Sequence, residues 1–237
     1  MTAPIQLVGG HGRVEILDRA CAELRKLEEF LVSLLDGLGL RGDGEGKGDE
    51  GEALLVLTSD HGTQLLDHGR FGKGASALHP FNTQIPLYIR HPDGPRGLQV
   101  MPFVQSHDLL PTVMRLLDVP YANVDGQDAW TLVTGEKEQL RDHVVCGWAG
   151  FVSGPAGGRA SVRDDEWNYV TTVHQEDPAP ELYHLPSDPK QERNLADTHQ
   201  DELRRMQALL ATKLAAIDAP EELFTRLGLV GFSPTED

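Results

Sequence analysis

The stretch of sequence that decides the fold runs from Ala53 to Gly74 and reads ALLVLTSDHGTQLLDHGRFGKG. It opens with five apolar residues, 53–57, which is typical of a strand buried on both faces, as in a parallel sheet under helices. The run ends abruptly in the sequence TSDHG, 58–62, at the end of the strand where open α/β sheets bind their ligands. The stretch therefore predicts a buried strand followed by a ligand-binding turn.

Asp60 and His61 are candidate metal ligands. A neighbouring carboxylate and imidazole that leave a strand together can converge on one cation, because the turn frees them from the strand's alternation. Lys73, which stands between two glycines, would bring a positive charge to an anionic substrate. The alternative interpretation is a strand-to-loop turn with a capping Asp60 and a solvent-facing Lys73, and a motif as short as DHG does not separate the two.

Several segments, taken in order, resemble the later part of the sulfatase family. That family belongs to the alkaline phosphatase superfamily and includes arylsulfatases and phosphonate monoester hydrolases. The resemblance extends from about residue 14 to residue 214 and rests on five segments: LTSDHGTQLLDHGRFGKG at 57–74, FNTQIPLYIR at 81–90, SHDLLPT at 106–112, ELYHLPSDP at 181–189 and RNLA at 193–196. Several motifs in the family's order are more specific than any one of them.

The resemblance implies a set of site residues. Asp60 and His61 match the family's second pair of metal ligands, and Lys73 matches the catalytic lysine that contacts substrate oxygens. His68 and His79 are candidates for substrate binding, with turn capping or packing as the alternative for each. The implied cofactor is a divalent cation, and this ligand chemistry suits calcium, magnesium or manganese.

The family's nucleophile has no match in this chain. In the family, a Cys or Ser in the pattern Cys/Ser-x-Pro/Ala-x-Arg is converted to formylglycine, and an acidic pair that follows the first strand supplies the other metal ligands. Cys21 and Arg25 have the right separation, but Glu23 stands at the Pro/Ala position. Cys21 also lies on the apolar stripe of an amphipathic helix, where we expect a buried, unmodified thiol. Cys146 lacks the arginine, and no acidic pair precedes Val14.

Composition excludes several classes of protein. The net charge of −16 and the pI near 4.9 argue against nucleic-acid binding, which needs a basic face. Two cysteines make neither a disulfide framework nor a zinc cluster. No stretch approaches the ~18 apolar residues of a membrane span, and the N-terminal residues do not form a signal-peptide pattern. These features predict a cytoplasmic protein that is not a membrane protein.

The remaining patterns predict an α/β fold: a partial sulfatase-type sheet with flanking helices and a small C-terminal antiparallel α+β subdomain. Apolar residues at helical spacing predict a long helix from Val14 to Leu38. Turn signals separate short β-like runs at 143–148, 160–163, 167–173 and 181–185, and a last helix is expected at about 200–217. The expected domains are 1–135, the C-terminal portion of the catalytic domain, and 136–237, the subdomain.

The sequence thus predicts a sulfuric ester hydrolase by family, with an isolated chain that is incomplete and inactive. It would be a truncated product, a fragment or one piece of a split enzyme acting on a sulfate or phosphonate ester. A missing half would leave a sheet edge and an apolar face that need cover, so we expect a complementing N-terminal half or a homo-oligomer. The alternatives are a non-catalytic sulfatase-like binding protein and a fragment of a phosphonate or phosphodiester hydrolase.

Overall fold

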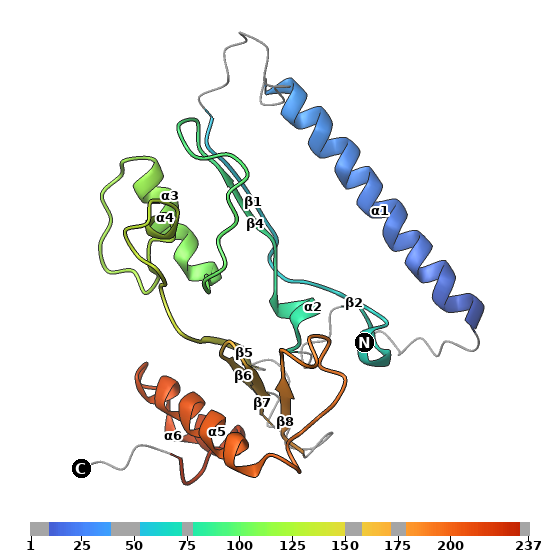
Figure 1. Cartoon of the computed structure of the whole chain (residues 1–237), viewed down its shortest axis with the longest axis vertical. Coiled ribbons are helices and arrows are strands. Elements are labelled where there is room, and N and C mark those ends of the chain that lie inside the picture. Colours follow the sequence, from blue (N-terminus) through green and yellow to red (C-terminus); the bar gives the residue numbers. More distant parts are fainter. Residues whose placement is uncertain (1–9, 39–52, 73–77, 150–157, 172–178, 233–237) are drawn as a thin grey trace. The chain divides into compact units, whose positions relative to one another are not determined.

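The structure is a computed structural model that describes residues 10–38, 53–72, 78–149, 158–171 and 179–232 (Figure 1). The chain divides into two compact units. Unit 1 comprises Met1–Gly74 and Ile85–Arg96, and unit 2 comprises Ala75–Gln84 and Gly97–Asp237. The domain boundary predicted near residue 135 lies within unit 2 and stays a prediction about the family's domains.

Unit 1 begins with the long helix α1 (Gly10–Gly37), close to the helix predicted from residue 14. Much of its apolar stripe is exposed within the described part of the chain, although Leu31 and Leu35 are half-buried. Leu24, Leu27 and Phe30 are 60%, 50% and 62% exposed. Cys21 on the same helix is also exposed, so the prediction that it is buried was wrong. The helical spacing identified an apolar face, but it carried no information about what packs on that face.

The strand predicted from the apolar run is β1 (Leu55–Thr58), and it pairs antiparallel with β4 (Leu87–Arg90). Within the described residues these two strands form a two-stranded sheet. Leu55, Val56 and Leu57 are half-buried. The expectation of a parallel strand buried on both faces was therefore wrong for this chain, because the one neighbouring strand seen here is antiparallel.

The segment after β1 forms a small hairpin. β2 (Gln64–Leu65) pairs antiparallel with β3 (Phe71–Gly72), and the short 3₁₀ turn η1 (Asp67–Gly69) connects them. The Asp67 carboxylate accepts the backbone N–H of Leu65 at 2.9 Å. Unit 1 therefore presents Asp60 and His61 on the turn after β1 and His68 on this hairpin.

Unit 2 contains the short helix α2 (Pro80–Thr83) and a helical segment of η2 (Ser106–Asp108), α3 (Leu109–Leu116) and α4 (Trp130–Val133). Asp108 organises this segment. Its side chain is fully buried, forms an ion pair with Arg141, and accepts the backbone N–H groups of Gln105 at 2.7 Å and Gln127 at 2.8 Å. A buried carboxylate needs such partners because an unpaired buried charge is very costly.

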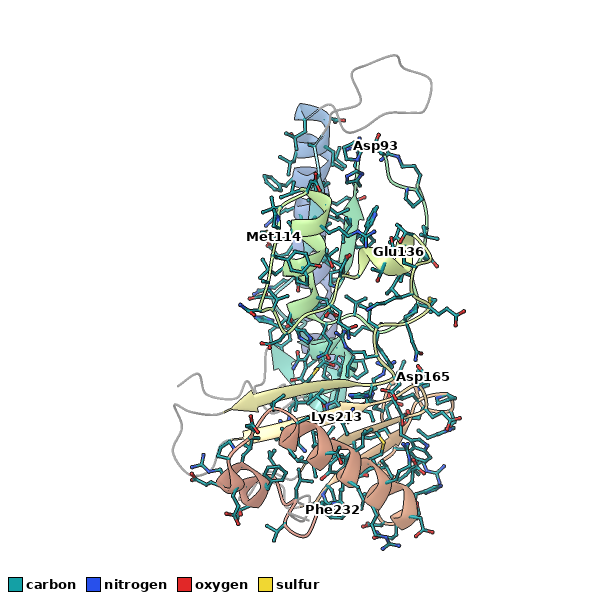
Figure 2. The ribbon with its side chains drawn as sticks, turned by 90° about the vertical axis from the view of Figure 1, so that its left-hand side faces the viewer. Asp93, Met114, Glu136, Asp165, Lys213 and Phe232 are labelled. Atoms are coloured by element: carbon teal, nitrogen blue, oxygen red, sulfur yellow. The ribbon has the colours of Figure 1, made fainter. Side chains whose placement is uncertain are left out.

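A second ion-pair network ties α3 to the residues on either side of α4. Arg115 on α3 binds Asp128 at 2.8 Å and Glu136 at 2.5 Å, and Figure 2 labels Glu136 beside this helical segment. Arg115 and Glu136 are more exposed than the Asp108 pair, and exposed ion pairs contribute little to stability. The network therefore orients the segment more than it stabilises it.

The C-terminal part of unit 2 is a four-stranded antiparallel sheet, as predicted. The strands β5 (Val144–Ala149), β6 (Gly158–Arg163), β7 (Trp167–Val170) and β8 (Glu181–His184) lie in sequence order. The helices α5 (Gln200–Ala215) and α6 (Glu221–Arg226) contribute to its apolar core.

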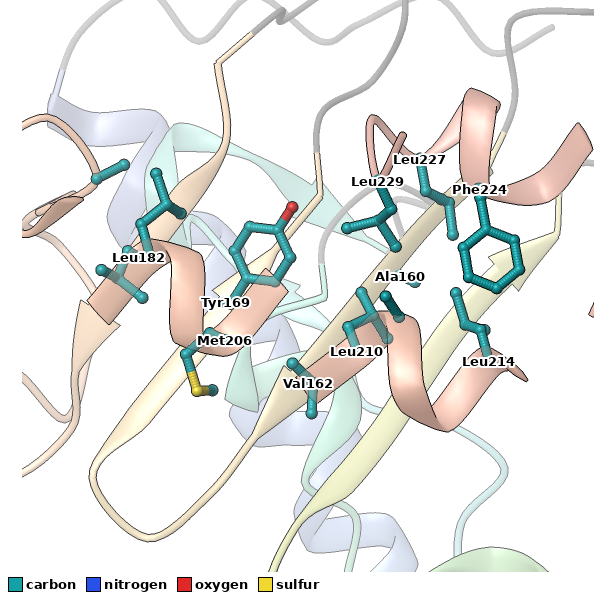
Figure 3. Close-up of a cluster of buried hydrophobic side chains, with 13 residues drawn as sticks. Ala160, Val162, Tyr169, Leu182, Met206, Leu210, Leu214, Phe224, Leu227 and Leu229 are labelled. Carbon is teal, nitrogen blue, oxygen red and sulfur yellow. The ribbon is translucent and has the colours of Figure 1, made fainter. Parts of the chain in front are cut away.

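That core is the best-buried cluster among the described residues (Figure 3). Val162 and Leu182 of the sheet and Met206 and Leu210 of α5 are completely buried. Each side chain of this kind contributes about 1.5–3 kcal/mol when it leaves water. The core explains why the C-terminal α+β subdomain holds together with short strands.

Candidate functional site

The candidate site begins where β1 ends. The Thr58 hydroxyl donates to the carbonyl of Pro86 at 2.8 Å, which fixes the end of β1 against the segment that leads into β4. The Ser59 hydroxyl donates to the carbonyl of His61 at 2.5 Å and closes the turn on itself. These two bonds fix the turn that carries Asp60 and His61.

Asp60 and His61 converge. Oδ2 of Asp60 lies 3.6 Å from Nε2 of His61, and both side chains reach solvent, with 87% and 43% exposed. Oδ1 of Asp60 accepts the backbone N–H of His61 at 2.9 Å, which fixes the carboxylate and leaves Oδ2 on the side of the imidazole. The two side chains predicted to share a cation are thus brought together.

The imidazole of His61 is oriented by its neighbour. Nδ1 lies 2.7 Å from the carbonyl oxygen of Gly62, which can only accept a hydrogen bond. The proton is therefore assigned to Nδ1, and Nε2 keeps its lone pair on the side of Asp60. Metal-binding histidines use this arrangement, in which one ring nitrogen donates to a carbonyl and the other binds the ion.

Oδ2 of Asp60 and Nε2 of His61 are spaced as two ligands of one divalent cation would be. Ligand bonds of about 2.1–2.4 Å that meet at roughly 90–120° place their donor atoms about 3–4 Å apart, which includes the observed 3.6 Å. Among the described residues, no group of three or more His, Cys, Asp or Glu side chains gathers to hold a metal. The spacing of the pair is compatible with a shared cation, and further ligands would have to come from elsewhere.

Of the other two predicted site residues in this stretch, the structure describes His68 but not Lys73. His68 lies in η1 with an exposed side chain and a left-handed backbone, φ 49°. Its role in substrate binding stays a prediction. Lys73 lies outside the described residues, so its predicted role also stays a prediction.

His79 belongs to unit 2 and is buried, which favours the packing interpretation over substrate binding. Its Nε2 lies 2.8 Å from Oε2 of Glu181, and its ring meets that of Tyr183 edge-on at 5.6 Å. Arg159 pairs with the other carboxylate oxygen of Glu181, and the Tyr183 hydroxyl donates to Oε2 at 2.8 Å. Sequence reasoning missed this cluster, because no local pattern links positions 102 residues apart.

The cluster lowers the pKa of Glu181. Burial raises the pKa of this carboxyl, but hydrogen bonds from His79, Arg159 and Tyr183, together with the charge of Arg159, outweigh burial and lower the pKa to about 2. Glu181 is therefore ionised at neutral pH. It acts as a charged anchor that holds the segment around α2 on the C-terminal sheet.

Neither cysteine shows the features of the family's nucleophile. Burial raises the pKa of the Cys146 thiol, and the nearby Arg163 offsets only part of that rise. A thiol with a raised pKa is a poor nucleophile, because the thiolate is the reactive form. Cys21 is exposed on α1, and the sequence around it departs from the family's pattern at Glu23.

Comparisons with known proteins give the class of the fold. The structure is similar to that of a phosphonate monoester hydrolase of Agrobacterium radiobacter, with a TM-score of 0.57 and 28% identity over 70% of this chain and 35% of that protein. It is also similar to a 2-O GAG sulfatase, with a TM-score of 0.64 and 21% identity over 75% of this chain and 39% of that protein. The fold is thus part of the α/β fold of the sulfatases.

Sequence comparisons find similarity to the same family. The model of the Sulfatase family matches residues 30–119. Arylsulfatase K of Xenopus laevis is 27% identical over 193 residues, which are 78% of this chain and 34% of that protein. The chain is therefore similar to part of the sulfatase family and spans about a third of the length of this relative. Among the helices of the described residues, none has the length and apolar character needed to cross a membrane.

Proposed function

We propose that this chain is part of a metal-dependent sulfuric ester hydrolase and supplies Asp60 and His61 as two of its metal ligands. The observation that carries the proposal is the 3.6 Å approach of Oδ2 of Asp60 to Nε2 of His61, with both atoms oriented by backbone hydrogen bonds. The match to the Sulfatase family supports it, because sulfatases generally use a divalent metal.

A bound cation would supply Lewis acidity toward a nonbridging ester oxygen. In this chain, Asp60 would neutralise part of the cation's charge, and the Nδ1–H bond from His61 to the Gly62 carbonyl would hold the imidazole in place. Lys73 would add a positive charge for the substrate oxygens. Such local charge is needed because the chain as a whole carries −16 and repels free anions.

The attacking group and the remaining ligands are proposed to come from a second polypeptide segment. The sequence holds no Cys/Ser-x-Pro/Ala-x-Arg motif, and two protein ligands are fewer than the three or more that hold most catalytic cations. The uncovered apolar residues of α1, including Leu24, Leu27 and Phe30, provide a surface that such a segment would bury. If no such segment exists, the same surface suits a non-catalytic, sulfatase-like binding protein.

A phosphonate monoester hydrolase is the second candidate. Its support is the 28% identity to the phosphonate monoester hydrolase of Agrobacterium radiobacter. Sulfate and phosphonate esters both place anionic oxygens on a cation, so the residues of this chain do not distinguish them. Comparing p-nitrophenyl sulfate with p-nitrophenyl phenylphosphonate in the reconstituted enzyme would do so.

The proposal is tested by activity with and without a complementing segment. The purified chain is expected to show negligible hydrolysis of p-nitrophenyl sulfate with calcium, magnesium or manganese. Addition of an N-terminal sulfatase segment that carries the nucleophile motif should restore turnover, and Asp60→Ala should abolish it. Robust metal-dependent hydrolysis by the chain alone, lost in Asp60→Ala, would mean that the chain contains a nucleophile after all.

A further inference from the structure

A hollow of about 270 Å³ lies on the C-terminal subdomain, within unit 2. It is lined by an indole, two imidazoles, a guanidinium, a hydroxyl and one aliphatic side chain: Trp167, His184, His199, Arg193, Ser187 and Leu195. These groups come from β7, from β8 and the turn after it, and from the residue that precedes α5. None of them has a role in the proposed metal site.

The aromatic wall is built around Trp167. Its ring centroid lies 4.8 Å from that of His184 and 5.6 Å from that of His199. Trp167 is only partly buried and packs on one side against the apolar core. An indole that is fixed by a core and still borders a hollow offers a rigid surface for the face of a ring-shaped ligand.

Both imidazoles are oriented by a hydroxyl group beside Nδ1. The Ser187 hydroxyl donates to the carbonyl of His184 at 3.4 Å, and Nδ1 of His184 lies 2.8 Å from that hydroxyl oxygen. In the same way the Thr198 hydroxyl donates to the carbonyl of Leu195 at 3.2 Å and lies 2.9 Å from Nδ1 of His199.

Nδ1 of each imidazole therefore has a hydroxyl partner, and Nε2 is the ring nitrogen that can hydrogen-bond with a ligand hydroxyl, as donor or acceptor according to the tautomer. Two imidazoles oriented in this way in one hollow suit a ligand with several hydroxyl groups.

Arg193 supplies the positive charge. Asp188 accepts the backbone N–H groups of Glu192 at 3.1 Å and of Arg193 at 2.8 Å, so its carboxylate fixes the turn that carries the arginine. Among the described residues, none forms an ion pair with the Arg193 guanidinium. An arginine of this kind binds a sulfate or carboxylate through two parallel N–H bonds.

We propose that this hollow binds an anionic saccharide unit. The sugar ring lies against Trp167, its hydroxyls hydrogen-bond with Nε2 of His184 and of His199, and its sulfate or carboxylate pairs with Arg193. The proposal concerns binding alone and does not depend on the metal site or on hydrolysis.

The test is a titration of the whole chain, followed by the three indole N–H signals in a ¹H–¹⁵N spectrum. Trp167→Phe assigns the Trp167 signal. N-acetylglucosamine 6-sulfate and glucuronate are the anionic probes, N-acetylglucosamine is the neutral probe, and sodium sulfate is the free anion. Saturable movement of the Trp167 signal, with at least tenfold tighter binding of an anionic sugar than of the neutral sugar and of sulfate, supports the proposal.

Two variants distinguish the effect of the Arg193 charge from a general effect of charge or a loss of folding. Arg193→Gln should lower the affinity for the anionic sugars at least tenfold and leave the weak binding of N-acetylglucosamine unchanged. Arg204→Gln removes an exposed arginine that pairs with Asp201 on α5 and should leave all affinities unchanged. Thermal unfolding of each variant shows that the subdomain remains folded.

Three results would overturn the proposal. If free sulfate bound as tightly as the anionic sugars, the hollow would be a simple anion site that does not recognise the sugar. Equal losses in Arg193→Gln and Arg204→Gln would show a general charge effect. Stoichiometric zinc binding that displaces the sugars and is lost in His184→Gln would make the two imidazoles metal ligands.

Discussion

Oε2 of Glu181 lies 2.8 Å from Nε2 of His79, although 102 residues separate the two in the sequence. Arg159 binds the other oxygen of the same carboxylate. This buried contact joins the segment that leads into α2 to the C-terminal sheet. That segment begins at residue 78, five residues after Lys73. A residue expected to face substrate therefore acts in this structure as an anchor, and the anchor can be tested by stability.

Glu181→Gln should lower the free energy of unfolding of unit 2 by about 3 kcal/mol. The substitution keeps the shape of the side chain but removes the charge that Glu181 presents to the buried guanidinium of Arg159, and removing one partner of a buried ion pair typically costs about 3–5 kcal/mol. Urea unfolding followed by tryptophan fluorescence measures the change. Glu192→Gln, at an exposed position in the same subdomain, is the matched control and should change stability by less than about 0.5 kcal/mol. Equal effects of the two substitutions would show that the anchor contributes nothing specific.

Acid should destabilise the same unit through Glu181. The folded-state pKa is lowered to about 2 from an ordinary value of 4.5, so the stabilisation is fully present above pH 4.5 and is lost as the pH falls toward 2. The shift corresponds to roughly 3 kcal/mol. Unfolding free energies measured between pH 6 and pH 2.5 should fall steeply in the native chain and less steeply in Glu181→Gln. Parallel pH curves for the two proteins would assign the acid sensitivity to other carboxyl groups, such as Asp108, whose pKa is also lowered.

Gly126→Ala should prevent unit 2 from folding normally. A Cβ atom at this position would lie 1.9 Å from the carbonyl oxygen of His107, next to the buried Asp108, so the backbone has to move. Gly147→Ala is the control, because its Cβ would meet the carbonyl oxygen of Arg159 at an ordinary 3.8 Å. The melting temperature should drop by several degrees or more in the first variant and change little in the second. A native-like melting temperature in Gly126→Ala would mean that the close approach is not present in solution.

The cysteines should differ in reactivity. Cys21 is exposed on α1, whereas Cys146 is partly buried with a raised pKa, so a maleimide should label Cys21 at least tenfold faster. Mass spectrometry after timed labelling of the native chain gives both rates, and denatured protein gives the reference in which the two should be similar. Slow labelling at Cys21 would show that another surface, such as that of a second copy, covers α1.

Local patterns predicted the elements of this fold well. Apolar spacing placed the first helix from residue 14, and the structure has it from Gly10 to Gly37. The last helix, expected at 200–217, is Gln200–Ala215, and the four short strands of the C-terminal sheet lie within a few residues of the predicted runs. These features depend on residues close together in the chain, where spacing, turn residues and caps carry the information.

Features that depend on distant partners could not be predicted in the same way. The apolar run at 53–57 indicated complete burial, yet β1 is half-buried because one antiparallel strand covers it in the described chain. The same limit applies to Cys21, to the ion pair of Asp108 with Arg141, and to His79 beside Glu181. The adjacent pair Asp60 and His61 was accessible to sequence reasoning because one turn positions both side chains.

The central claim is that Asp60 and His61 form part of a cation site, and manganese binding tests it most directly. Mn²⁺ is paramagnetic and broadens the amide signals of residues near the bound ion, here the turn at 58–62. We expect weak, saturable broadening in this turn that Asp60→Ala abolishes, that His61→Ala reduces strongly, and that His184→Gln, in the C-terminal subdomain, leaves unchanged. Broadening of the same turn that persists at full strength in Asp60→Ala would contradict the account.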